Sequence, residues 1–178
     1  PPPPPRTASS IFSKARRCPT RANLNDYLAY PKVVACGGSW MVPADAVAQK
    51  DWARIESLTR SAVNKMLGLE VRHVGLNSGT PEQALKDAQT LSKLLGWPLD
   101  EHANATFVGE GFEVMKIPFR GSHGHVAVAC NNIRRARWHL ERRGFAFDDA
   151  SASYKDGKLR ALYLQDEIAG FAFHLLQK

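Results

Sequence analysis

The sequence predicts an α+β fold in which two β-α-β-β-β modules follow a smaller β/α segment. Two observations support this class. From about residue 70 to the end, short strand-like runs alternate with two helix-like stretches, and the same order of elements occurs twice. Before that region, one continuous apolar run is followed by a stretch with helical spacing. We therefore expect three parts: a tail at 1–22, a β/α segment at 23–69 and paired modules at 70–178.

Composition restricts the class of protein further. The chain has 178 residues, of which 44% are hydrophobic and 23% charged, which is typical of a globular protein and excludes wholesale disorder. No apolar stretch approaches the roughly 18 residues that a membrane helix needs, so we expect no membrane partner. Three widely spaced cysteines (Cys18, Cys36 and Cys130) and no signal-peptide core favour a reducing, cytoplasmic location.

The net charge of +7 is unevenly distributed. Residues 1–21 contain five basic residues and no acid, which leaves 19 basic and 17 acidic residues in the remainder. The excess therefore belongs to a Pro/Ser/Arg-rich stretch, for which we expect disorder. A second basic cluster falls on a predicted helix and comprises Arg134, Arg135, Arg137, Arg142 and Arg143. No series of aromatic residues that could stack on bases accompanies this cluster. We therefore interpret the cluster as a solvated helix face and expect no nucleic-acid partner.

The segment at 23–69 has the pattern of a β/α unit. A short amphipathic helix is expected within residues 23–31. The apolar run Val33–Cys36 then leads directly into Gly37-Gly38-Ser39, a pattern that predicts a strand buried on both faces, as in a parallel sheet or barrel. Asp51 is placed to cap a longer helix with apolar residues at three- and four-residue spacing, which ends at Gly68.

The second region reads as strands separated by two helices. The first helix should run from the cap at Thr80 to Gly96, and the second from Asn131 or Asn132 to Gly144. The expected strands lie at 71–77, 105–109, 112–117, 125–130, 152–154, 159–164 and 171–176, with a weakly marked one near 99–102.

The repeat places metal-competent side chains at equivalent positions. Each module has one in its first strand and one in its last, and the four residues are His73, Glu113, His125 and His174. A pseudo-twofold relation between the modules would direct all four toward one point. Three imidazoles and a carboxylate suit a divalent ion such as zinc, nickel, iron or manganese. A lone histidine on an apolar strand is more often a satisfied core or surface residue, but four at repeat-equivalent positions favour a metal site.

These motifs resemble a known superfamily. The runs RHVGLN, GFEVMK, GHVAVAC and FAFHLLQK are similar to the ligand-bearing strands of the vicinal oxygen chelate superfamily, which includes glyoxalases, bleomycin-resistance proteins and extradiol dioxygenases. The resemblance implies two βαβββ modules forming a half-open barrel around a divalent metal. It also implies that the four residues named above are the ligands, with His174 standing where many members have a glutamate.

The first region resembles a different family. The run VVACGGSWMV, followed by DWARIESLTRSAV, is similar to the C-terminal part of bacterial 2-dehydro-3-deoxy-phosphogluconate / 4-hydroxy-2-oxoglutarate aldolases, over about residues 23–66. These are TIM-barrel lyases of carbohydrate metabolism that release pyruvate from a 2-keto acid through a lysine Schiff base. The resemblance implies a phosphate-binding role for Gly37, Gly38 and Ser39, and it assigns no catalytic residue. The strands that bear the lysine and the base in that family would precede residue 23, so we expect no aldolase activity from this chain alone.

Three classes of function remain open at this point. The chain is a fragment of a bifunctional aldolase with a glyoxalase-like C-terminal domain, a stand-alone metal-dependent enzyme of the glyoxalase or dioxygenase type, or a small-ligand-binding module without turnover. In each case the expected ligand is a small 2-keto acid or another oxoacid. Self-association into a homo-oligomer is left open.

Overall fold

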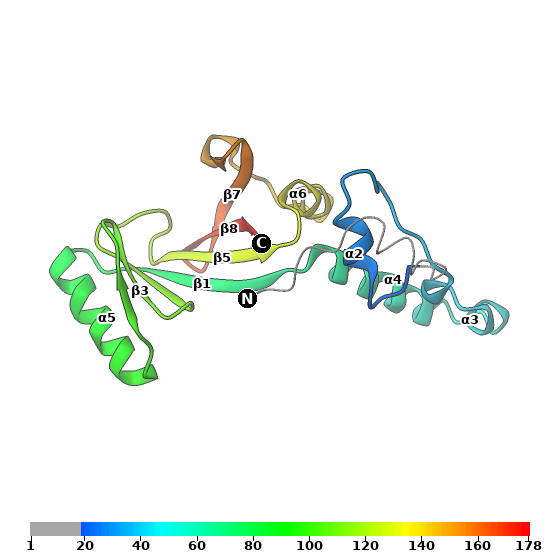
Figure 1. Cartoon of the computed structure of the whole chain (residues 1–178), viewed down its shortest axis with the longest axis horizontal. Coiled ribbons are helices and arrows are strands. Elements are labelled where there is room, and N and C mark those ends of the chain that lie inside the picture. The colour runs from blue at the N-terminus through cyan, green and yellow to red at the C-terminus, as the bar shows by residue number, and fades with distance from the viewer. Residues whose placement is uncertain (1–18) are drawn as a thin grey trace. The chain divides into compact units, whose positions relative to one another are not determined.

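The computed structural model describes residues 19–178, which divide into two compact units between Met66 and Leu67 (Figure 1). The disorder expected for residues 1–22 therefore falls almost entirely outside the described residues. Within the described part of the chain, no helix is long and apolar enough to cross a membrane.

The first unit consists of helices and connecting turns. Its elements are α2 (Leu24–Leu28), η1 (Ser39–Met41), α3 (Ala44–Ala48) and α4 (Trp52–Leu67). The Asp51 carboxylate accepts a hydrogen bond from the backbone N–H of Arg54 at 3.0 Å, which confirms the expected cap of α4. Gly68 follows the last turn of α4 with a φ of 58°. Glycine adopts this left-handed conformation without steric cost, and so it ends the helix. The side chain of Asn25 donates to the carbonyl of Lys65 at 2.9 Å and so ties α2 to α4.

The strand predicted at Val33–Cys36 is wrong. These residues belong to no helix or strand, and Val34 is 93% exposed. A β-strand needs hydrogen bonds from a neighbouring strand, and the described residues of the first unit contain no strand at all. The apolar run has the composition of a buried strand, but a strand requires pairing partners that the described residues of this unit do not provide.

The second unit contains one eight-stranded sheet. Its strands are β1 (Glu70–Asn77), β2 (Leu99–Glu101), β3 (Ala105–Val108), β4 (Phe112–Met115), β5 (Gly124–Cys130), β6 (Ser153–Lys155), β7 (Lys158–Ile168) and β8 (Phe171–Gln177). The spatial order is β2-β3-β4-β1-β5-β8-β7-β6. In each half the first strand pairs in parallel with the last, and the antiparallel pair of β1 and β5 joins the halves at the centre (Figure 1). This topology confirms the α+β class and the two β-α-β-β-β modules, including the weakly marked strand, which is β2.

One helix covers each half of the sheet. Helix α5 (Pro81–Leu95) packs on β3 and β4, where Ala84 and Ala88 are fully buried against Val108 and Val114. The small alanine side chains allow the helix backbone to approach the sheet closely. Helix α6 (Ile133–Glu141) packs on β7 and β8 in the same way.

Both helices begin at the caps expected from the sequence. The Thr80 hydroxyl accepts from the N–H of Gln83 at 3.2 Å, and the Asn132 side chain accepts from the N–H of Arg135 at 2.9 Å. Each bond satisfies a backbone donor that the helix itself leaves unpaired.

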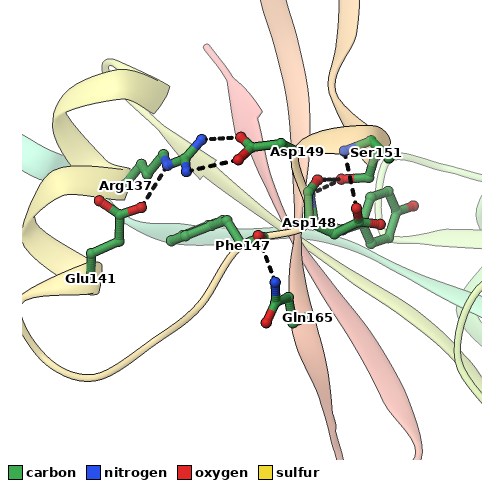
Figure 2. A network of polar contacts seen from close by, with 9 residues as sticks. Arg137, Glu141, Phe147, Asp148, Asp149, Ser151 and Gln165 are labelled. Carbon is green, nitrogen blue, oxygen red and sulfur yellow. Dashed lines mark hydrogen bonds and ion pairs between the residues drawn. The ribbon is translucent and has the colours of Figure 1, made fainter.

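A polar network fastens α6 to η2 (Asp149–Ser151), the short helix before β6 (Figure 2). The guanidinium of Arg137 donates to Glu141 at 2.7 Å and to both carboxylate oxygens of Asp149. It also lies 5.7 Å from the centre of the Phe147 ring. One arginine of the basic cluster on α6 is therefore engaged in ion pairs within the fold.

Candidate metal centre

The register of the central strands explains why the four predicted residues are equivalent. His73 of β1 lies opposite Ala127 of β5, and His125 of β5 lies opposite Gly75 of β1. The residue two positions after each histidine then pairs with the last strand of its own module: Gly75 with Glu113, and Ala127 with His174. The two modules are thus related by a pseudo-twofold axis through the β1–β5 pair.

The structure brings the four side chains together. His73 Nε2 lies 3.3 Å from His125 Nε2, and Glu113 Oε2 lies 3.2 Å from the first and 3.1 Å from the second. His174 joins the two histidines in a group whose ligand atoms all lie within 4.8 Å of one another. Two atoms bound to one ion through bonds of about 2.1 Å lie at most about 4.2 Å apart, so small side-chain rotations suffice to complete a coordination sphere.

Some ring nitrogens of the buried histidines in this group have no hydrogen-bond partner. His125 and His174 are 3% and 6% exposed. Among the described residues, Nδ1 of His125 and both ring nitrogens of His174 are buried without a hydrogen-bond partner. A buried polar atom without a partner is costly, and the unprotonated nitrogen of a neutral imidazole, here one nitrogen of His174, readily donates its lone pair to a metal ion. The donor set therefore fits a divalent ion.

The electrostatics of the group also suit a cation. Burial raises the pKa of Glu113, but hydrogen bonds from His125 and His73 outweigh it and hold that pKa at about 2. Burial, together with the charges of His125 and His73, lowers the pKa of His174 to about 4. At neutral pH, Glu113 is therefore a carboxylate and His174 a neutral imidazole, the forms in which both residues bind metals.

Gly75 determines where the His125 ring lies. A Cβ atom built on Gly75 would meet three atoms of that ring at 2.0 to 2.5 Å. The imidazole therefore occupies the space directly over the glycine backbone, on the strand opposite its own. Only a residue without a side chain allows this position.

The group opens into a cavity of about 450 Å³. The four predicted residues line it together with Asn104, Met115, Ile117, Pro118, Phe119 and Tyr163. Sequence reasoning missed the second set, and Tyr163 is its most informative member. Its ring stacks on that of His174 with centroids 4.6 Å apart. Burial and the nearby Glu113 carboxylate raise its pKa to about 12, so the phenol stays protonated.

The position of Tyr163 follows from strand pairing. Tyr163 lies directly opposite His174 in the β7–β8 register, so both side chains project from the same face of the sheet. The run LRALYL predicts a strand, but the sequence gives no indication that Tyr163 of this strand pairs with His174.

The Gly37-Gly38-Ser39 turn lies in the other unit. The three residues lead into η1, where Ser39 is the first residue and Gly38 the cap. A Cβ on Gly38 would meet Nε1 of Trp40 at 2.4 Å, while a Cβ on Gly37 would meet nothing within 4 Å. The turn does not follow a strand, as it would at the end of a barrel unit, and its phosphate-binding role stays a prediction.

Fold and site together define the second unit as a paired-module domain with a candidate metal centre.

The first region has sequence relatives of its own. The model of the family "KDPG and KHG aldolase" matches residues 6–58. The KHG/KDPG aldolase of Escherichia coli K12 is 52% identical over 56 residues, which is 29% of this chain and 26% of that protein. The 2-dehydro-3-deoxy-phosphogluconate aldolase of Pseudomonas aeruginosa is 44% identical over 61 residues, or 32% and 28%.

These matches confirm the resemblance to the aldolases and extend it. The family match begins at Arg6, within the stretch that composition assigned to a tail. The chain spans about a quarter of the length of these curated relatives. The first region is thus a segment homologous to these aldolases.

Comparison with solved structures finds matches at low sequence identity. Methylmalonyl-CoA epimerase from Mycobacterium tuberculosis has a TM-score of 0.46 at 14% identity, over 63% of this chain and 89% of that chain. A hypothetical protein from Bacillus halodurans C-125 has a TM-score of 0.44 at 14% identity, over 62% and 94%. A variant of homoprotocatechuate 2,3-dioxygenase from Brevibacterium fuscum has a TM-score of 0.42 at 14% identity, over 61% and 32%.

Proposed function

We propose that the second unit is a metal-dependent enzyme domain that binds a small oxoacid through a divalent ion held by His73, His125, His174 and Glu113. One observation carries this proposal: four potential ligands related by the pseudo-twofold axis converge, and the buried His174 has no hydrogen-bond partner at either ring nitrogen among the described residues. Purely structural histidines would be expected to have their buried nitrogens hydrogen-bonded within the protein.

The residues around the cavity support a distinct role for each group. A bound divalent ion would supply Lewis-acid polarisation of two neighbouring oxygens of the oxoacid. The neutral imidazole of His174 offers a nitrogen lone pair to the ion, and the Glu113 carboxylate contributes a negative charge that balances a cation. The protonated phenol of Tyr163 lines the same cavity and is available to donate a hydrogen bond to an oxygen of the ligand.

For the first region we propose descent from an aldolase without the Schiff-base chemistry. A Schiff-base lysine works in a desolvated site, where its pKa falls. In the sequence, Lys32 is the lysine nearest to Gly37-Gly38-Ser39. Its side chain is exposed, and the residue lies in a turn of its own. The chain as a whole would then be a piece of a bifunctional protein in which the metal-dependent domain is the part with a formed site.

Metal binding is the direct test. The full chain, stripped with a chelator, is titrated calorimetrically with zinc, nickel, manganese and, without oxygen, iron(II). We expect one ion per chain, and we expect His125→Ala to abolish binding, because it removes the most buried of the ligands. His102→Ala is the matched control, since His102 is exposed, does not line the metal cavity and pairs with Asp100 at 3.1 Å.

Two outcomes would contradict the proposal. Equal metal affinity in the wild type and His125→Ala would place the ion elsewhere, and no binding by any of the four ions would leave the histidines structural. Release of pyruvate from 2-dehydro-3-deoxy-phosphogluconate is measured in parallel, and turnover by this chain would refute the proposed lack of aldolase chemistry.

A further inference from the structure

A second cavity in the paired-module unit lies apart from the metal centre. It measures about 530 Å³ and is formed by the start of α6, the turn between β6 and β7, and the end of β8. Its lining residues are Asn132, Ile133, Arg134, Gly157, Lys158, Leu159, Arg160, Gln177 and Lys178. None of them lines the metal cavity. On β8, Gln177 is three residues beyond His174, so the two side chains point to opposite faces of the sheet.

The lining is strongly basic. It carries four cationic side chains and, among the described residues, no acidic one. Lys178 pairs with Glu70 at 3.1 Å, whereas no ion pair involves Arg134, Lys158 or Arg160 within the described part of the chain. Arg137, on the same helix as Arg134, is by contrast held by two carboxylates. Three like charges are thus gathered around one concavity without an ion-pair partner among the described residues.

The backbone brings these cations together from separate elements. Asp156 and Gly157, with φ values of 52° and 68°, form the tight turn that places Lys158 at the start of β7. Lys158 and Arg160 are two residues apart on that strand and so share a face. Arg134 reaches the same cavity from the first turn of α6.

Side chains, rather than the helix amides, are available to a ligand here. The N–H of Ile133 donates to the side chain of Gln177 at 3.2 Å, and that of Arg135 donates to Asn132 at 2.9 Å. The backbone amides that usually bind an anion at the start of a helix are therefore largely occupied by hydrogen bonds to side chains. Any anion in the cavity would be held chiefly by the guanidinium and ammonium groups.

We infer that this cavity binds a phosphate-bearing small molecule, such as a phosphate monoester or a diphosphate. Arginine side chains present paired N–H donors that match the oxygens of a phosphate, and the cavity is lined by one arginine from α6 and by an arginine and a lysine from β7. The volume lies within the roughly 300–1,000 Å³ that is common for small-ligand sites. A concave site with converging charges suits a compact multivalent anion better than an extended acidic chain.

The test uses inorganic pyrophosphate as the probe. The full chain, freed of divalent metals so that the metal centre cannot bind the probe, is titrated calorimetrically at about 50 and about 150 mM salt, where screening of exposed charges differs. We expect saturable binding with one site per chain. Arg134→Gln combined with Arg160→Gln should weaken it at least tenfold, and Lys158→Gln alone should weaken it severalfold.

Two controls make the result specific. Arg143→Gln removes one charge from the exposed turn that follows the same helix, outside the cavity, and should leave the affinity unchanged. His125→Ala should also leave it unchanged, because the metal centre is a separate site. Circular dichroism verifies that each variant is folded, and Lys158→Gln, on an exposed side chain, serves if the double variant does not fold.

Three outcomes would overturn the inference. The wild type fails to bind pyrophosphate, the cavity variants bind it as well as the wild type does, or Arg143→Gln loses as much affinity as they do. The second outcome would place the anion elsewhere, for example at Gly37-Gly38-Ser39, and the third would indicate nonspecific attraction. None of these outcomes bears on metal binding, so the two proposals fail independently.

Discussion

A glycine controls the geometry of the candidate metal centre. Gly75 has no side chain, and the space that a Cβ would fill is taken by the His125 ring. The pseudo-twofold axis gives the other histidine a similar neighbour, since Ala127 lies opposite His73 and is fully buried. Each first-strand histidine thus faces a small residue, which leaves room for the ring to lie across the neighbouring strand.

Gly75→Ala is therefore expected to weaken metal binding by roughly 10- to 100-fold, the range seen when a group that orients a ligand is changed. The added methyl group forces the His125 ring away from Glu113 and His73, while the strand itself tolerates alanine. Calorimetric titration with zinc measures the effect. Val71→Ala, an exposed substitution on the same strand, should bind zinc as the wild type does. Unchanged affinity in Gly75→Ala would show that the ring position is not needed.

Cysteine reactivity provides a second prediction at this scale. Burial raises the pKa of the Cys130 thiol to about 11, and Cys130 is fully buried. Because the thiolate is the reactive form, Cys130 should resist alkylation by iodoacetamide at pH 8, where Cys36, which is partly exposed, should react. Mass spectrometry of peptides from native and urea-unfolded protein distinguishes the sites. Rapid labelling of Cys130 in the native protein would contradict the burial of β5.

At the scale of elements, the connection between the modules forms one wall of the metal cavity. Residues 116–123 link β4 to β5, and Ile117 and Phe119 of this link line the cavity with largely exposed side chains. Asn77, the last residue of β1, holds the link in place. Its side chain donates to the carbonyl of Gly121 at 2.8 Å and accepts from the N–H of Phe119 at 3.1 Å.

Asn77→Ala removes both bonds and leaves a backbone donor and acceptor without these partners. We expect the free energy of unfolding to fall by about 1–3 kcal/mol, the usual cost of such a loss. Urea denaturation followed by circular dichroism measures it, with Gln89→Ala on the exposed face of α5 as the control. A change as small as that of the control would mean that water replaces both bonds.

A further pair of contacts connects the same link to Tyr163. Arg120 donates to the Asp148 carboxylate at 2.9 Å, and its guanidinium lies 4.9 Å from the centre of the Tyr163 ring. Asp148 directly precedes Asp149, which holds Arg137 on α6 (Figure 2). The Tyr163 ring stacked on His174 thus also contacts the link between the modules.

At the scale of the whole molecule, the paired modules contain their own sheet, helices and core. All eight strands belong to residues 67–178, as do both helices that cover the sheet. We therefore expect a chain of residues 67–178 to fold by itself and to bind zinc with the affinity of the full chain. Dispersed amide signals in an NMR spectrum and calorimetry check the two parts of this prediction. An unfolded fragment would show that the aldolase-like region is required for folding.

Much of the second unit could be predicted from the amino-acid sequence because its pattern is local. Alternating strands, capped helices and a repeat of about 50 residues are properties of neighbouring residues. The repeat also identified four equivalent side chains, His73, Glu113, His125 and His174, which the structure brings together. Whether they hold a metal stays a prediction until an ion is measured.

Other features depended on which segments meet in space. The run Val33–Cys36 has the composition of a buried strand, yet it forms none, because a strand exists only with a hydrogen-bonded neighbour and composition does not reveal one. The stacking of Tyr163 on His174 and the closeness of Gly75 to His125 follow from strand register. The basic cavity likewise joins Arg134, interpreted from sequence as part of a solvated helix face, with two cations from β7. Local patterns thus determine the elements and their candidate ligands, whereas pairing between distant segments determines what each side chain faces.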